Sequence, residues 1–207
     1  GGAGSTPSPT PISGGTPTPT AVATLTPTPT PTSAAGTPTA TVTPTPVPLI
    51  TVRAIATGST ATSDNHVTVN VPPGVQAGDV MIAQVAVRGG SGLTMVAPAG
   101  WDLVRRDNAA KTLAQAIYQR TVTAAQPEPA SYTWNFNAGN NAAAAIIAYI
   151  GVSNAIPLDD NNGQANASST LITAPGTSQT GMPASDLLLG LYAIPNGSAV
   201  TVPAGTN

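Results

Sequence analysis

The chain has 207 residues, of which six are Lys or Arg and eight are Asp or Glu, so its net charge is −2. This balance excludes an electrostatic case for binding nucleic acid or an anionic membrane surface. The absence of cysteine excludes disulfide bonds and thiolate metal sites. No apolar run approaches the ~18 residues that a membrane-spanning helix needs, and we therefore expect no membrane span.

The N-terminal 48 residues differ from the rest of the chain in composition. They contain 12 Pro, 15 Thr and 4 Ser, and no charged residue. Proline fixes the backbone torsion φ near about −65° and removes an amide donor, so an extended course is the default for such a sequence. We interpret residues 1–48 as a Thr/Pro-rich extended stalk or tail, and residues 49–207 as a folded head.

Alternation of Thr with Pro is typical of O-glycosylated stalks on secreted and surface proteins. Only 7% of the residues are charged, so attached sugar would provide solubility that surface charge provides in most proteins. The alternative is an unmodified linker. The candidate O-glycosylation sites are Thr16, Thr18, Thr20, Thr26, Thr28, Thr30, Thr32, Thr37, Thr39, Thr43 and Thr45. Asn166 and Asn196 each begin an N-glycosylation triplet, a weaker signal because such triplets arise by chance.

In the head, apolar and polar residues alternate with a period of two, which is typical of half-buried strands. Such runs predict strands over residues 50–55 and 66–71. A third strand over residues 80–88 is apolar on both faces apart from Gln84, which favours a central position in a sheet.

The clearest alternation places Tyr132, Trp134 and Phe136 on one face of a strand, and we expect this face to anchor the core. Residues 142–152 are ambiguous, because four alanines favour a helix whereas the isoleucines and the neighbouring strands favour a buried strand. We predict a strand there.

Further strands are predicted over residues 101–106, 111–123, 170–174 and 187–194. Some nine short strands without amphipathic helices indicate an all-β protein, an antiparallel β-sandwich. Residues 95–100 and 200–205 both end in Pro-Ala-Gly, and the first of them precedes a strand. If the second also precedes one, the sandwich in this sequence lacks one or more final strands.

The order of several short motifs resembles a known module. These are Pro73-Gly-Val-Gln-Ala-Gly-Asp79, Pro98-Ala-Gly-Trp101 with Leu103-Val-Arg105, Glu128-Pro-Ala-Ser-Tyr-Thr-Trp134 and Ala148-Tyr-Ile-Gly-Val152. Together they resemble a jelly-roll-like β-sandwich of secreted and surface proteins from bacteria such as Chloroflexi and Actinobacteria. The resemblance covers roughly residues 49–207. It implies an extracellular or cell-surface location, a structural or adhesive role, and no catalytic centre.

Few residues point to chemistry. Asp159 and Asp160 offer oxygens for a weak calcium site, but they lack the spacing of a helix-loop-helix calcium loop and suit an ordinary loop equally well. His66 is the only histidine, so the chain has no His-based metal triad. We expect no enzyme and no cofactor.

Two functions of different classes follow. The first is a structural subunit of an extracellular filament, which binds copies of itself through the tail by strand addition and carries covalent glycans. The candidate contact residues are Val22, Leu25, Val42, Val47 and Leu49, where apolar side chains interrupt the Thr-Pro runs. The alternative is a monomeric stalked adhesin or carbohydrate-binding head, for which exposed aromatic residues such as Trp101 would serve as platforms.

Overall fold

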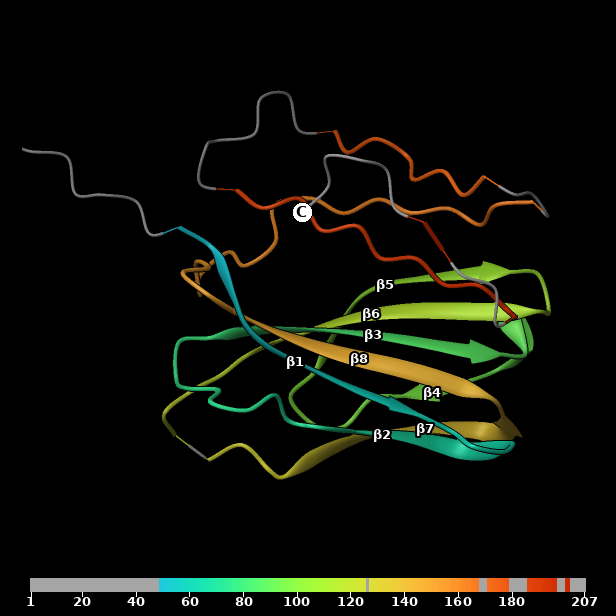
Figure 1. The fold of residues 1–207 in the computed structure, drawn as a ribbon, viewed down its shortest axis with the longest axis horizontal. Helices are drawn as coiled ribbons and strands as arrows, with labels where there is room; N and C mark the ends of the chain where they lie inside the picture. The colour runs from blue at the N-terminus through green and yellow to red at the C-terminus, as the bar shows by residue number, and fades with distance from the viewer. Residues whose placement is uncertain (1–48, 126, 168–170, 179–185, 197–199, 202–207) are drawn as a thin grey trace, which may run out of the picture. The chain divides into compact units, whose positions relative to one another are not determined.

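The computed structural model describes residues 49–125, 127–167, 171–178, 186–196 and 200–201. Their regular structure consists of eight strands and a short 3₁₀ turn at Gly90–Gly92. The strands are β1 (Thr51–Ser59), β2 (Asp64–Asn70), β3 (Val80–Arg88), β4 (Met95–Val96), β5 (Asp102–Ala109), β6 (Leu113–Thr121), β7 (Ser131–Asn140) and β8 (Ala142–Ile150) (Figure 1).

The strands form two antiparallel sheets that pack face to face. The larger sheet has the order β1-β8-β3-β6-β5 and the smaller sheet the order β2-β7-β4. All pairings are antiparallel. The eight strands thus divide between a five-stranded and a three-stranded sheet. The expected all-β sandwich is therefore confirmed.

β3 lies in the middle of the larger sheet, as its apolar composition predicts. Its inward side chains, Met81, Ala83, Val85 and Val87, are fully buried. On the opposite face Val80 and Ile82 are also buried. A strand that is covered on both faces loses the polar alternation of a half-exposed strand, which explains the sequence of β3.

The core combines large side chains from the smaller sheet with small ones from the larger sheet. Tyr132, Trp134 and Phe136 on β7 are buried, as expected, and Trp101 packs edge-on against Trp134 with ring centroids 5.4 Å apart. The larger sheet supplies alanines to the same cluster, namely Ala83, Ala114, Ala116, Ala142, Ala144 and Ala148. Small residues opposite aromatic rings allow the two sheets to reach the density of a close-packed interior.

The ambiguous segment forms β8, which pairs with β1 on one side and β3 on the other. The prediction of a strand over a helix is confirmed. Ladders of backbone hydrogen bonds on both sides of β8 outweigh the intrinsic helix preference of alanine, which amounts to less than ~1 kcal/mol per residue.

β1 crosses close to β2 at a glycine. A Cβ atom on Gly58 would lie 2.1 Å from the backbone oxygen of Thr68. Only a residue without a side chain permits this approach. The contact brings the two sheets together at the β1–β2 corner of the sandwich.

Two predicted strands are wrong where the structure describes them. Residues 171–174 and 187–194 form no ladder; they are extended segments without regular pairing. Their apolar and β-branched residues satisfied the strand pattern, but a strand also requires a partner, and the described residues offer none. The short strand β4 was not predicted, and the second Pro-Ala-Gly turn lies outside the described residues.

Within the described residues, no helix has the length and apolar character required to cross a membrane.

Candidate functional site

Most of the predicted contact and O-glycosylation residues lie outside the described residues, since Val22, Leu25, Val42, Val47 and all eleven candidate threonines fall within 1–48. Leu49 is described, and 72% of its surface is exposed. It lies two residues before β1. An apolar side chain therefore stands at the point where the tail joins the sandwich.

The candidate N-glycosylation and calcium residues lie in the segments that follow β8. The Asn166 side-chain amide donates to the Thr173 carbonyl oxygen at 3.0 Å, and Asn196 is exposed. The Asp160 carboxylate accepts hydrogen bonds from the Ser178 amide at 2.7 Å and the Ser178 hydroxyl at 2.8 Å, and these bonds lower the pKa of Asp160. Asp159 is exposed.

His66 lies on β2, where its Nδ1 atom is 2.9 Å from Asp64 Oδ1, and both side chains are about half-exposed. Among the described residues, no group of three or more His, Cys, Asp or Glu side chains could hold a metal ion.

A polar cluster that sequence reasoning missed joins β6, β7 and the loop between them. Arg120 donates to Glu128 from both Nε and Nη2, at 3.0 and 2.8 Å. Tyr132 donates its hydroxyl to the same carboxylate, and Arg120 also donates to the Gly100 carbonyl oxygen at 3.1 Å. The guanidinium lies 5.5 Å from the centre of the Tyr132 ring. The cluster closes this end of the sandwich over the aromatic core.

The titration of the cluster follows from its contacts. Burial on its own would raise the pKa of Glu128, but the hydrogen bonds from Arg120 and Tyr132 outweigh burial and lower it. Burial raises the pKa of Tyr132 strongly, and the hydrogen bond to the Glu128 carboxylate raises it further. Glu128 is thus held as a carboxylate and Tyr132 as a neutral phenol. The Glu128 carboxylate is hydrogen-bonded to Tyr132 and to Arg120, which suits a structural role.

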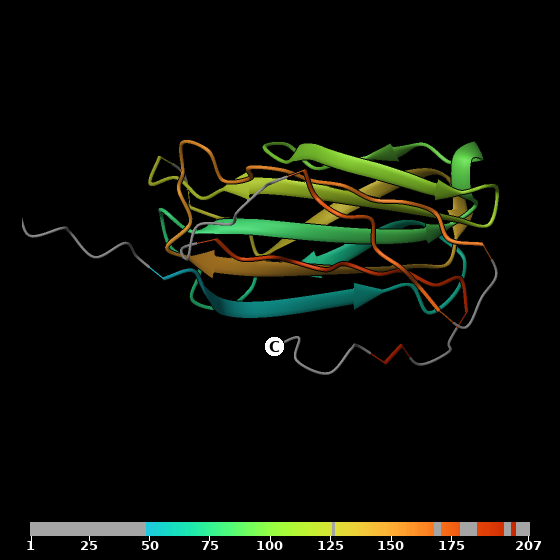
Figure 2. The ribbon, with the colours of Figure 1, turned by 90° about the horizontal axis from the view of Figure 1, so that it is seen from above.

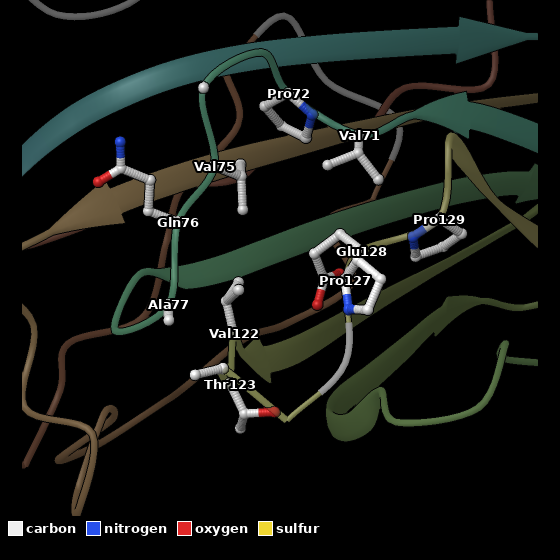
Figure 3. Close-up of a pocket in the computed structure, with 12 residues that line it drawn as sticks. Val71, Pro72, Val75, Gln76, Ala77, Val122, Thr123, Pro127, Glu128 and Pro129 are labelled. Atoms are coloured by element: carbon white, nitrogen blue, oxygen red, sulfur yellow. The ribbon is translucent and has the colours of Figure 1, made fainter.

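Beside this cluster lies a shallow hollow of about 540 Å³ between the loop after β2 and the loop after β6. Figure 3 shows Val71, Pro72 and Val75 on one side of it, across from Pro127 and Pro129. Of the described residues that line the hollow, only Glu128 is ionisable, and its carboxylate is bound to Arg120. The lining therefore offers apolar contact but no free group for acid–base chemistry.

The outer face of the larger sheet, which is turned away from the smaller sheet, carries an apolar cluster and two glutamines. Val80, Ile82 and Tyr149 form a buried cluster there, and Leu191 packs against it. Gln84 donates its side-chain amide to the Tyr192 carbonyl oxygen at 2.8 Å, and Gln115 donates to that of Leu191 at 3.2 Å. We call residues 186–196 the cover segment, because they lie over this face (Figure 1).

The cover segment itself exposes apolar side chains. Leu187, Leu188 and Leu189 are all exposed, and the neighbouring strand β1 exposes Val52 and Ile55. Large exposed apolar groups are ordinary when scattered. Here the exposed apolar groups belong to a chain that has only six basic and eight acidic residues, and exposed apolar groups with few charges favour contact with another molecule.

Nearly all aromatic residues are buried in the interior. Trp101, Tyr118, Tyr132, Trp134, Phe136 and Tyr149 are buried, and only Tyr192 is exposed, by 37%. These seven are all the aromatic residues of the chain. The prediction that Trp101 serves as an exposed platform is therefore wrong, because its ring packs between Tyr132 and Trp134.

A scan against protein-family models finds no match, and searches of the curated proteins and of the solved structures also find none.

Proposed function

We propose that the chain is a structural subunit of an extracellular, O-glycosylated filament or pilus-like polymer that assembles through its N-terminal tail. The observation that carries this proposal is the set of exposed apolar side chains on β1 and the cover segment, where Val52, Ile55 and Leu188 are each at least half-exposed. Such a surface is poorly suited to an isolated soluble head and well suited to contact with another copy.

The tail supports the same proposal. Its 48 residues carry 15 Thr and no charge, so hydroxyl-linked sugar is the natural source of its solubility. A surface polymer also needs no catalytic group, and the charged side chains of two ion pairs of the head, Arg53–Asp79 and Arg120–Glu128, are bound to each other.

The alternative, a monomeric adhesin or carbohydrate-binding head, gains less support. Sugar-binding platforms rely on exposed aromatic rings, and Tyr192 is the only exposed aromatic residue of the chain.

Negative-stain electron microscopy of the native material over a range of protein concentrations tests the proposal. We expect filaments of regular width, and an intact mass that exceeds the sequence mass by whole hexose units. Isolated particles at every concentration would eliminate the polymer, and an unmodified mass would eliminate the glycan.

A further inference from the structure

The larger sheet ends in two edge strands of different character. β5 carries four charged residues within eight positions, namely Asp102, Arg105, Arg106 and Asp107. Charged edges are a common device by which sheets avoid pairing with another strand. β1 carries only Arg53, and the guanidinium of Arg53 binds Asp79. From Ala54 to Ser59, β1 has neither charge nor proline.

The edges of the smaller sheet are less suited to pairing. β4 has only two residues, which is too short for a stable ladder. β2 is overlain by β1 where Gly58 approaches Thr68. β1 is therefore the long, unprotected edge among the described strands, and Figure 2 shows it in blue-green at one margin of the larger sheet.

The register of β1 determines which of its amides are open. The Thr60 amide donates to Ala142 at 2.9 Å, and one-to-one pairing continues from there back to Ala54 opposite Ala148. Because bonding alternates along an antiparallel pair, the even-numbered residues bond to β8. The amide and carbonyl groups of Ile55, Thr57 and Ser59 point away from β8 to the open edge.

The tail contains a sequence that complements this edge. Residues 26–32 read Thr-Pro-Thr-Pro-Thr-Pro-Thr. In an extended strand successive amides point to opposite sides, so proline at every second position leaves all threonine amides on one side and none on the other. Such a strand can pair along one side only, and after pairing it presents a proline edge that stops further addition.

We propose that residues 26–32 of a second copy add to the open edge of β1 as a sixth strand. This inference rests on the proposed function and specifies the contact that would build the polymer. The threonine amide and carbonyl groups pair with those of Ile55, Thr57 and Ser59. Because each tail binds the next head in the same direction, the contact is head-to-tail and extends into a fibre.

The pairing also assigns the two faces of the tail. Residues that pair directly have their side chains on the same face of a sheet, so the threonines lie beside Ile55 and Thr57, both of which are exposed. The proline rings lie on the other face, beside Ala54 and Ala56. Sugars on the threonine hydroxyls therefore point to solvent, and glycosylation and strand addition are compatible.

The length of the tail favours another copy over the same head. Thr30 precedes β1 by 21 positions, which spans about 60 Å in an extended proline-rich segment. This exceeds the diameter of a domain of this size, whose radius of gyration is about 15 Å. A segment of this reach can extend past its own head to a second copy.

Disulfide cross-linking between single-cysteine variants tests the proposal without background, because the chain has no cysteine. One full-length variant carries Thr57→Cys and the other carries Thr28→Cys or Thr30→Cys, on the same face. The two are mixed and oxidised, and the products are separated without reducing agent. Leu103→Cys on β5 is the control for the other edge, because Leu103, like Thr57, is exposed.

We expect a cross-linked heterodimer with Thr57→Cys at several times the yield obtained with Leu103→Cys. Equal yields from both edges, or no heterodimer, would overturn the proposal. A third variant carries both Thr57→Cys and Thr30→Cys. A disulfide within this chain, without any heterodimer from the single-cysteine variants, would also overturn the proposal, since the tail would then bind its own head.

Electron microscopy of the unsubstituted protein in the same buffer distinguishes a failure of the proposed filament from a failure of the proposed contact at β1. Filaments without cross-linking at Thr57 would support the proposed polymer and would show that the tail does not bind the edge of β1. Cross-linking at Thr57 without filaments would support strand addition at β1 and would contradict the proposed polymer.

Discussion

Arg53 on β1 binds Asp79, the residue before β3, through two hydrogen bonds of 2.5 and 2.9 Å, although β8 lies between the two strands. Asp79 is buried, with 3% of its surface exposed, and also accepts the Gln76 amide at 2.8 Å. The pair therefore joins the edge strand to the centre of the sheet, and it turns the only charge of β1 away from the open edge.

Removing the Asp79 carboxylate should destabilise the head. Asp79→Ala deletes three charge-assisted hydrogen bonds, and we expect the free energy of unfolding to fall by on the order of 2–3 kcal/mol. Urea denaturation followed by tryptophan fluorescence measures this. The control Asp159→Ala changes an exposed aspartate and should alter stability little; equal losses in both variants would contradict a structural role for the pair.

The Glu128 cluster should make stability depend on pH in the acid range. The pKa of Glu128 is lowered from 4.5 in the fold, so its contribution is present above this value and is lost as the pH falls through the lower, folded pKa. Glu128→Gln should cost about 2 kcal/mol at pH 7, and the gap to the unsubstituted protein should narrow at pH 3. A gap that stays constant between these pH values would show that the carboxylate charge is irrelevant.

The pKa of Tyr132 is raised, so its contribution runs the other way. Stability from the neutral phenol is present below the ordinary tyrosine pKa of 10.0 and is lost as the pH rises above it. We expect Tyr132→Phe to flatten the loss of stability as the pH rises above 10.0, as measured by urea denaturation. Tyr192→Phe is the control, because Tyr192 is 37% exposed and lies outside the Glu128 cluster; equal flattening in both variants would contradict a role for the Tyr132 hydroxyl.

Gly58 should tolerate no side chain. The added methyl group of Gly58→Ala would overlap the Thr68 backbone oxygen, and separating β1 from β2 should cost about 1–3 kcal/mol or more. Gly176→Ala is the matched control, since nothing lies within 4 Å of the position that its added methyl group would take. Thermal unfolding should show a lower midpoint for Gly58→Ala only; similar midpoints would contradict the close crossing.

The cover segment should detach when its two side-chain donors are removed. Gln84→Ala with Gln115→Ala deletes the hydrogen bonds to Tyr192 and Leu191, whereas the β-sandwich beneath keeps its ladders. We expect several-fold faster proteolysis within residues 186–196 and nearly the same melting temperature. Gln76→Ala, in the loop after β2, is the control, and unchanged proteolysis in the double variant would show that other contacts hold the segment.

The fold was largely predictable because its strands have clear local patterns. The period-two pattern of β7 and the apolar run of β3 each required only neighbouring residues. Residues 187–194 have the same local pattern but no ladder, because a strand is completed by a partner that local sequence does not name. Periodicity predicts which face of a strand each side chain lies on, but it does not predict which other strand the backbone pairs with.

The polar contacts were beyond sequence reasoning for a related reason. Arg53 and Asp79 are 26 residues apart, and their pairing depends on the strand order of the larger sheet. Trp101 remained a candidate platform because the pattern of β7 assigned only its own three aromatic residues to the core, whereas the Trp101 ring packs against Trp134. The open edge of β1 likewise follows from topology, although its lack of charge was visible in the sequence.

Residue-resolved hydrogen exchange along β1 tests the central claim most directly. In the full chain we expect the Ile55 and Thr57 amides to exchange quickly at low protein concentration and more than tenfold more slowly where filaments form. The Ala56 amide, which faces β8, should be protected at both concentrations. Fast exchange of Ile55 and Thr57 within filaments would contradict strand addition at this edge, as would equal protection at every concentration.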